Sequence, residues 1–165
     1  MALNTDVGKK QRRQSLLSAD QAAENKALRL IAARERSSHE LTGRLLSAGF
    51  GQDIVRALVK RFVDAGIVDD GRFCRLYIVS KRNQGWGMYR ITKALNQFGI
   101  DAHDYPDLID EFTDEDDELE RAVQALSRYR GRARDEYSGR YRYLVTKGFS
   151  AAVVREAMKE WRQVL

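Results

Sequence analysis

The segment KRNQGWGMYRI, residues 81–91, places two glycines and a tryptophan among cations, a combination that could cradle a phosphate group. A dinucleotide-binding loop requires the spacing G-x-G-x-x-G after a strand, but Arg90 occupies the position of the last glycine. The Gly-Lys-Ser/Thr ending of a Walker loop does not occur in the sequence. We therefore interpret the segment as a turn between helices: Gly85 ends the first helix in a left-handed conformation, and Gly87 relaxes the chain into the second. Trp86 either packs over the groove between these helices or is a partly exposed anchor for a partner protein.

Cations surround this turn. The preceding stretch, DDGRFCRLYIVSKRN, is typical of a helix with Phe73, Leu76, Tyr77 and Ser80 on one face and cations on another. The cations before and after the turn form the first candidate binding set, with Trp86 as its apolar anchor: Arg72, Arg75, Lys81, Arg82, Arg90 and Lys93.

A second basic stretch, residues 128–147, carries seven cations interleaved with four tyrosines. Guanidinium groups grip phosphates and aromatic rings stack on bases, so this composition is typical of nucleic-acid surfaces. The alternative is a solvated face whose tyrosines partly serve the core. The second candidate binding set consists of Arg130, Arg132, Arg134, Arg140 and Arg142.

Residue types for metal or nucleophilic chemistry are scarce. The chain has two histidines and one cysteine, Cys74, which we expect on the side of a helix. The acidic run DEFTDEDDELE lacks the glycine and alternating ligands of a calcium loop. We expect Thr113 or Asp114 to cap the next helix there, with a partner-binding role as the alternative. The sequence thus predicts no catalytic residue, no metal site, no cofactor and no enzymatic activity.

Charge is distributed unevenly along the chain. The 165 residues have a net charge of +5, but residues 101–120 hold eleven acidic side chains and no lysine or arginine. The other 145 residues therefore carry 29 cations and 13 anions, a net charge of +16. Such a basic body is either a solubility feature or a surface for a polyanion or an acidic protein. The sequence has no secretory signal and no membrane-spanning run, so we expect a cytoplasmic protein.

The candidate binding residues lie on predicted helices, and the helical pattern recurs about every fifty residues. Leu45, Leu95 and Leu144 are each followed, four residues later, by a glycine that is expected to stop a helix: Gly49, Gly99 and Gly148. Three units of three short helices are predicted, preceded by a flexible basic leader at residues 1–23. The units cover residues 24–66, 67–112 and 113–165. The expected first helices are 24–35, 70–83 and 115–129, the second 38–48, 88–98 and 138–147, and the third 53–65, 103–112 and 151–163. The predicted fold is all-α, with three tandem three-helix repeats in an elongated, curved array.

Residues 66–100, GIVDDGRFCRLYIVSKRNQGWGMYRITKALNQFGI, resemble the signature of the RecX family of bacterial recombination regulators. The stretch ALRLIAARERSSHELTGRLLSAGF is similar to the first repeat of that family. The resemblance covers residues 27–112 well and the third repeat loosely.

The resemblance implies a non-enzymatic regulator that binds RecA and lodges in the groove of the RecA–DNA filament. It implies inhibition of RecA recombinase, ATPase and co-protease activities, and hence a role in DNA repair, recombination and the SOS response. We expect a monomer without membrane contact, and direct contact with single- or double-stranded DNA is left open. The alternative is a helical DNA-binding transcription regulator, although the third helices are mixed or acidic and not basic.

Overall fold

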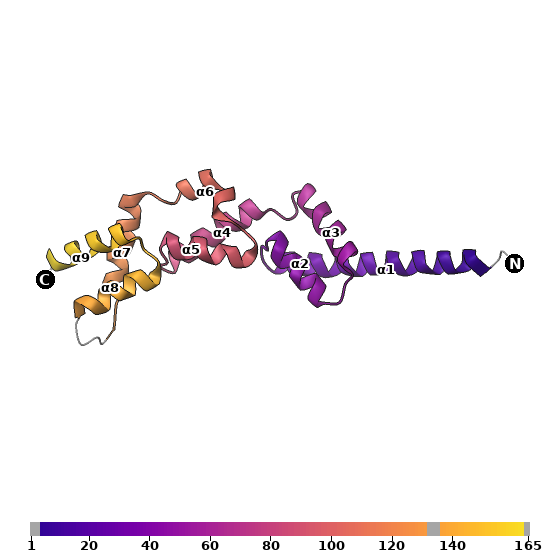
Figure 1. Cartoon of the computed structure of the whole chain (residues 1–165), viewed down its shortest axis with the longest axis horizontal. Coiled ribbons are helices and arrows are strands. Elements are labelled where there is room, and N and C mark those ends of the chain that lie inside the picture. Colours follow the sequence, from indigo (N-terminus) through magenta and orange to yellow (C-terminus); the bar gives the residue numbers. More distant parts are fainter. Residues whose placement is uncertain (1–3, 132–135, 164–165) are drawn as a thin grey trace. The chain divides into compact units, whose positions relative to one another are not determined.

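The computed structural model describes residues 4–131 and 136–163, and these residues contain helices and no strand. The chain forms two compact units, Met1–Phe73 and Cys74–Leu165, each of which is described by itself. Figure 1 labels the helices along the chain, and the predicted all-α class is confirmed.

The first unit contains α1 (Asn4–Ala33), α2 (Ser38–Ser47) and α3 (Gln52–Asp64). The predicted start of α2 is confirmed, because the Ser37 hydroxyl accepts a hydrogen bond from the Glu40 N–H at 3.0 Å. α1 begins at Asn4, inside the stretch that was predicted as a flexible leader over residues 1–23. Residues 4–23 contain no proline and are rich in glutamine, arginine, lysine, alanine and leucine, which all favour a helix.

Small residues form the buried face of α1. Ala23 and Ala27 are fully buried, whereas Leu28 is 45% exposed. The two small residues lie four apart and allow α1 to approach its neighbours closely. The core of the first unit is completed by residues of α2, α3 and the following turn: Leu41, Leu45, Val55, Leu58, Val59, Phe62 and Val68.

The next helices surround the turn that contains Trp86. They are α4 (Asp70–Asn83), which contains the division between the units, and α5 (Met88–Leu95), which continues as a 3₁₀ turn over Asn96–Phe98. The predicted helix 103–112 is split into a 3₁₀ turn, Ala102–Asp104, and the short α6, Pro106–Asp110. Pro106 is the first residue of α6. Proline has no backbone N–H to donate, which is tolerated in the first turn of a helix but breaks a hydrogen bond further inside one.

The remaining helices, α7 (Glu115–Ser127), α8 (Glu136–Lys147) and α9 (Ala151–Gln163), pack together at the carboxyl end of the chain (Figure 1). Their shared core is made of small and medium apolar side chains: Ala122, Ala125, Leu126, Leu144, Phe149, Val153, Val154, Ala157 and Met158. Tyr141 and Tyr143 pack against this core, as expected from the sequence.

The glycines of the repeat end their helices as predicted. Gly49, Gly99 and Gly148 have φ angles of 89°, 69° and 88°, in the left-handed region that favours glycine. Gly85 adopts a φ of 75°, so the predicted end of α4 is also confirmed. The boundaries drawn between the three repeats stay a prediction.

A carboxylate from a later helix caps α2 and α5 at their first residues: Asp70 of α4 for α2, and Glu118 of α7 for α5. Asp70 accepts hydrogen bonds from the Ser38 N–H at 2.7 Å and from the Ser38 hydroxyl at 2.6 Å. Glu118 of α7 accepts a hydrogen bond from the Met88 N–H, the first residue of α5, at 2.8 Å. Each of these two caps joins one predicted repeat to the next by a contact that no local motif indicates.

Candidate partner-binding surface

The first candidate cation, Arg72, is held within the first unit. Its guanidinium forms an ion pair with Glu35 at 2.7 Å and donates a hydrogen bond to the Ile67 carbonyl at 3.1 Å. The bond to Glu35 is the main cause of a raised pKa of Arg72. Arg72 therefore ties the end of the first predicted repeat to the start of the second.

Arg75 and Arg82 of α4 contact the acidic segment that follows in the chain. Arg75 pairs with Glu111, and Arg82 pairs with Asp117. The two guanidinium groups also lie over the ring of Phe112, at 5.9 Å and 5.1 Å from its centroid. The hydrogen bond from Arg75 lowers the pKa of the Glu111 carboxyl.

The acidic segment thus makes contacts within its own unit. Its carboxylates neutralise α4 through Glu111 and Asp117, and Glu118 caps α5. Asp114 accepts a hydrogen bond from the Asp117 N–H at 3.0 Å, so the predicted cap of α7 is confirmed at Asp114. The sequence indicated the charges on both sides but not that they meet, since the paired residues are 35 and 36 positions apart.

Trp86 is half-buried, and two of the candidate cations lie over its ring. The Lys81 amine is 4.8 Å from the ring centroid, and the Arg90 guanidinium carbon is 3.7 Å from it. Arg90 also donates a hydrogen bond to the Thr146 carbonyl at 3.3 Å. The indole is therefore neither a core residue nor a bare anchor, because it forms a cation–π cluster with Lys81 and Arg90.

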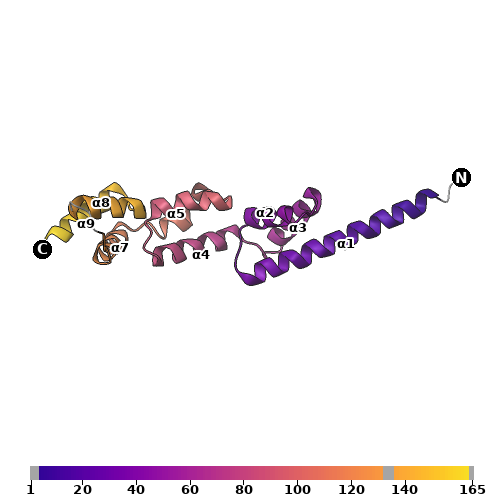
Figure 2. The ribbon, with the colours of Figure 1, turned by 90° about the horizontal axis from the view of Figure 1, so that it is seen from below.

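Gly87 has a role that the sequence did not show. Its φ of −80° is open to any residue, but a Cβ added there would lie 2.3 Å from the carbonyl oxygen of Gly148. The Gly87 N–H also donates to the Lys147 carbonyl at 2.9 Å. Figure 2 shows this junction, where the end of α8 meets the start of α5. Gly87 is thus needed for a close approach of two backbones and not for a turn.

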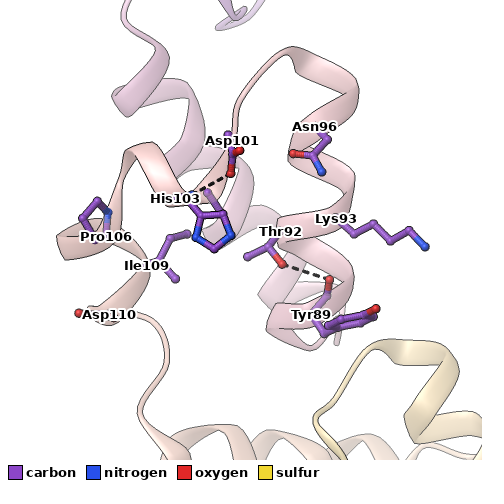
Figure 3. A pocket seen from close by; sticks show the side chains of 10 residues that line it. Tyr89, Thr92, Lys93, Asn96, Asp101, His103, Pro106, Ile109 and Asp110 are labelled. Carbon is purple, nitrogen blue, oxygen red and sulfur yellow. Dashed lines mark hydrogen bonds between the residues drawn. The ribbon is translucent and has the colours of Figure 1, made fainter.

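Lys93 borders a pocket of about 430 Å³ between α5 and the segment that contains α6. Figure 3 shows Thr92 facing this space and the Lys93 chain running outward, away from His103. Tyr89, on the same helix, is 72% exposed. Lys93 has no hydrogen-bond or ion-pair partner within residues 4–131 and 136–163, so its charge is available to a partner.

The second candidate set is only partly described. Arg132 and Arg134 lie outside the described residues. Arg140 is mostly buried: it pairs with Glu136 at 2.7 Å, donates to the Leu126 carbonyl at 2.9 Å and lies 4.7 Å from the Trp161 ring centroid. Arg130 and Arg142 are exposed, and each donates to a nearby backbone carbonyl: Arg130 to Ser127 at 3.0 Å, and Arg142 to Ser138 at 3.3 Å. Arg140 therefore packs at the edge of the core, whereas the side chains of Arg130 and Arg142 are exposed to solvent.

A basic cluster in the first unit was not singled out from the sequence. Arg34 and Arg36 each lie 2.5 Å from the same oxygen of Glu40, and Arg44 lies 3.9 Å from it. One carboxylate therefore faces three guanidinium groups in the first turns of α2. The spacing of four residues from Arg36 to Glu40 and from Glu40 to Arg44 is the signal that could have indicated this cluster.

Residues for metal or thiol chemistry do not assemble in the described part of the chain, where no group of three histidine, cysteine, aspartate or glutamate side chains could hold a metal ion. Cys74 is fully buried and does not lie sideways as expected, because the inner face of α4 is formed by Phe73, Cys74 and Ile78 while Leu76 is 51% exposed. Burial raises the pKa of the Cys74 thiol to about 11. No described helix is long and apolar enough to span a membrane.

Comparison with known proteins relates this chain to regulatory proteins along most of its length. Residues 23–62 match the family described as "RecX, first three-helix domain". The regulatory protein RecX of Halorhodospira halophila is 31% identical over 147 residues, which cover 85% of this chain and 88% of the relative. That of Acidithiobacillus ferrooxidans is 32% identical over 143 residues, covering 83% of this chain and 89% of the relative.

Solved structures share the fold. The crystal structure of RecX from Lactobacillus salivarius matches with a TM-score of 0.75 at 20% identity, covering 87% of this chain and 97% of that one. A second crystal structure, of a regulatory protein RecX, gives a TM-score of 0.77 at 23% identity over 93% of this chain and 77% of that one.

Proposed function

This chain belongs to the RecX family, and we propose that it binds the RecA recombinase and the RecA–DNA filament as a regulator without enzymatic activity of its own. In this role it inhibits the recombinase, ATPase and co-protease activities of RecA. The observation that carries the proposal is the relationship to regulatory proteins named RecX, which extends over both units of the chain.

The structure narrows the set of cations that we propose as contacts. Arg72, Arg75, Arg82 and Arg140 already pair with carboxylates of this chain, so their charge is largely neutralised and their role is to position helices. Arg132 and Arg134 lie outside the described residues. Among the described members of the candidate sets, the cations that pair with no described carboxylate are Lys81, Arg90, Lys93, Arg130 and Arg142, which we call the available cations.

Electrostatic attachment through the available cations suits a partner that is acidic or carries DNA. Exposed charges at the rim of an interface mainly raise the rate of association and make it salt-dependent. The Trp86 cluster adds an aromatic group, of the kind enriched at the energetic centre of interfaces, beside two of these cations.

A RecA ATPase titration tests the proposal. RecA on single-stranded DNA is expected to lose ATPase activity when the protein is added below equimolar amounts. The double variant Lys93→Glu/Arg142→Glu is expected to require about tenfold more protein for the same inhibition, which corresponds to roughly 1.4 kcal/mol of binding free energy.

The matched control is Lys26→Glu/Arg155→Glu, because Lys26 and Arg155 are exposed and the double change alters the net charge equally. This control is expected to inhibit like the natural protein. Lack of inhibition by equimolar natural protein would reject the proposal. An equal loss in both double variants would reject the contact residues while leaving the regulatory role in place.

A further inference from the structure

A cavity of about 450 Å³ lies between the end of α4 and the outer face of α7, in the second unit. Three arginines line it, Arg82, Arg121 and Arg128, together with the amide side chains of Asn83 and Gln124. None of the lining residues carries a carboxylate. The pairing of Arg82 with Asp117 offsets one of the three positive charges, and the charges of Asp117 and Glu118 act on Arg121, whereas Arg128 forms no ion pair with a described residue.

Arg121 is fixed by the end of α4. One of its terminal nitrogens, Nη2, donates to the Arg82 carbonyl at 3.1 Å and to the Trp86 carbonyl at 2.7 Å. The other, Nη1, is buried and has no hydrogen-bond partner among the described residues. A buried donor without a partner is unfavourable, and more so when the group is charged, so an acceptor that reached Nη1 would stabilise the protein. Burial, and then the nearby charge of Arg82, lower the pKa of Arg121.

The α7 side of the cavity follows one face of the helix. Arg121, Gln124 and Arg128 are spaced three and four residues apart, so their side chains project in the same direction. Arg128 is exposed and forms no ion pair within the described residues. Its guanidinium is therefore available to a ligand in the cavity that Arg121 also lines.

We propose that this cavity binds a phosphate group, through Arg121 and Arg128 with Gln124 as a neutral donor. Planar guanidinium groups bind phosphate oxygens in pairs of parallel hydrogen bonds, and such charge-assisted bonds are the strong ones. Three converging guanidinium groups suit a phosphate better than a carboxylate, because a phosphate offers more acceptor oxygens and carries up to two negative charges. The phosphate belongs either to a nucleic-acid backbone or to a free phosphate ion. Neither source requires RecA, so this proposal stands apart from the proposed function.

The test uses the full chain without RecA and two probes: inorganic phosphate, measured by calorimetry, and fluorescein-labelled oligo(dT), measured by anisotropy across a salt series. Arg128→Gln and Gln124→Ala are the test variants, since neither side chain forms a hydrogen bond or an ion pair with another residue that the structure describes. Arg155→Gln, an exposed arginine of α9, is the matched control. Arg121→Gln is unsuitable alone because it also removes the bonds to the end of α4.

Arg128→Gln is expected to weaken binding about tenfold, and for the oligonucleotide to reduce the salt slope by about one, whereas Arg155→Gln changes neither. Loss of affinity for both probes supports a general phosphate site. Loss for oligo(dT) alone assigns the site to a nucleic-acid backbone, and loss for inorganic phosphate alone assigns it to a free ion. Binding of neither probe, or equal loss in Arg128→Gln and Arg155→Gln, would overturn the proposal.

Discussion

Replacing Glu118 with alanine should destabilise the second unit more than any other single carboxylate change in the acidic segment. Glu118 is only 8% exposed, and its carboxylate accepts the hydrogen bond from the Met88 N–H at 2.8 Å. The residue before α5 is Gly87, which offers no side-chain cap. Glu118 therefore supplies from α7 the cap that α5 lacks locally, at the end of the helix where a negative charge is favourable.

The expected magnitude follows from the removal of one buried, charge-assisted hydrogen bond. Such a bond contributes about 1.5–3 kcal/mol, and its loss leaves the Met88 N–H buried without a partner. We expect Glu118→Ala to lower the free energy of unfolding by about 2–3 kcal/mol. For a unit of this size the melting temperature would fall by roughly 10 °C or more. Glu118→Gln keeps the acceptor and loses only the charge, so about 1 kcal/mol is expected.

Tryptophan fluorescence measures this effect selectively. The protein has two tryptophans, Trp86 and Trp161, and both lie in the second unit. Urea unfolding followed by this signal therefore reports the unit that contains Glu118. The control is Glu120→Ala, an exposed carboxylate on the same helix. If Glu118→Ala and Glu120→Ala shift the midpoint equally, the assigned cap does not stabilise α5.

Three further predictions concern other contacts. Gly87→Ala should destabilise the second unit by more than about 2 kcal/mol in thermal unfolding, because a Cβ would lie 2.3 Å from a backbone oxygen. The matched change Gly43→Ala, where no atom lies within 4 Å of the added Cβ, should instead stabilise the first unit by about 0.5–1 kcal/mol. Burial raises the pKa of the Cys74 thiol from 9.0 to about 11, so this thiol should resist alkylation at pH 8 unless the protein is unfolded. Between pH 9 and 11 the thiol ionises in the unfolded chain but not in the folded protein, so the stability of the fold should fall over this range. Rapid alkylation of the native protein would contradict the burial of Cys74. Arg75→Gln should raise the pKa of Glu111, which the hydrogen bond from Arg75 lowers, and an NMR titration measures this change. In the natural protein, the stability that this ion pair contributes should be lost as the pH falls through the pKa of Glu111. A Glu111 titration that is the same in both proteins would show that the pair does not form.

Local signals in the sequence predicted the helices well. Asp114 caps the helix that it was expected to start, α2 begins at Ser38 as predicted, and Gly49, Gly85 and Gly148 end their helices. These predictions succeeded because a cap or a left-handed glycine acts on residues within one turn of itself.

Contacts between distant residues could not be predicted in the same way. In the sequence, Arg75 and Arg82 indicated a free basic face. In the structure they pair with Glu111 and Asp117, which lie 36 and 35 residues further along the chain. Gly87 was interpreted as part of a turn, but the structure excludes a Cβ at this position because Gly148, which follows α8, lies too close. The buried face of α1 also gives a weak signal in the sequence, because Ala23 and Ala27 are less apolar than the exposed Leu28.

Direct binding to RecA filaments tests the central claim. RecA assembled on single-stranded DNA is sedimented with the labelled protein, in parallel with the same DNA without RecA and with the Lys93→Glu/Arg142→Glu variant. We predict that the natural protein enters the filament pellet at substoichiometric amounts, in excess of what DNA alone retains, and that the variant does so about tenfold more weakly. A natural protein that stays in the supernatant at equimolar RecA, while correctly folded by circular dichroism, would contradict the account.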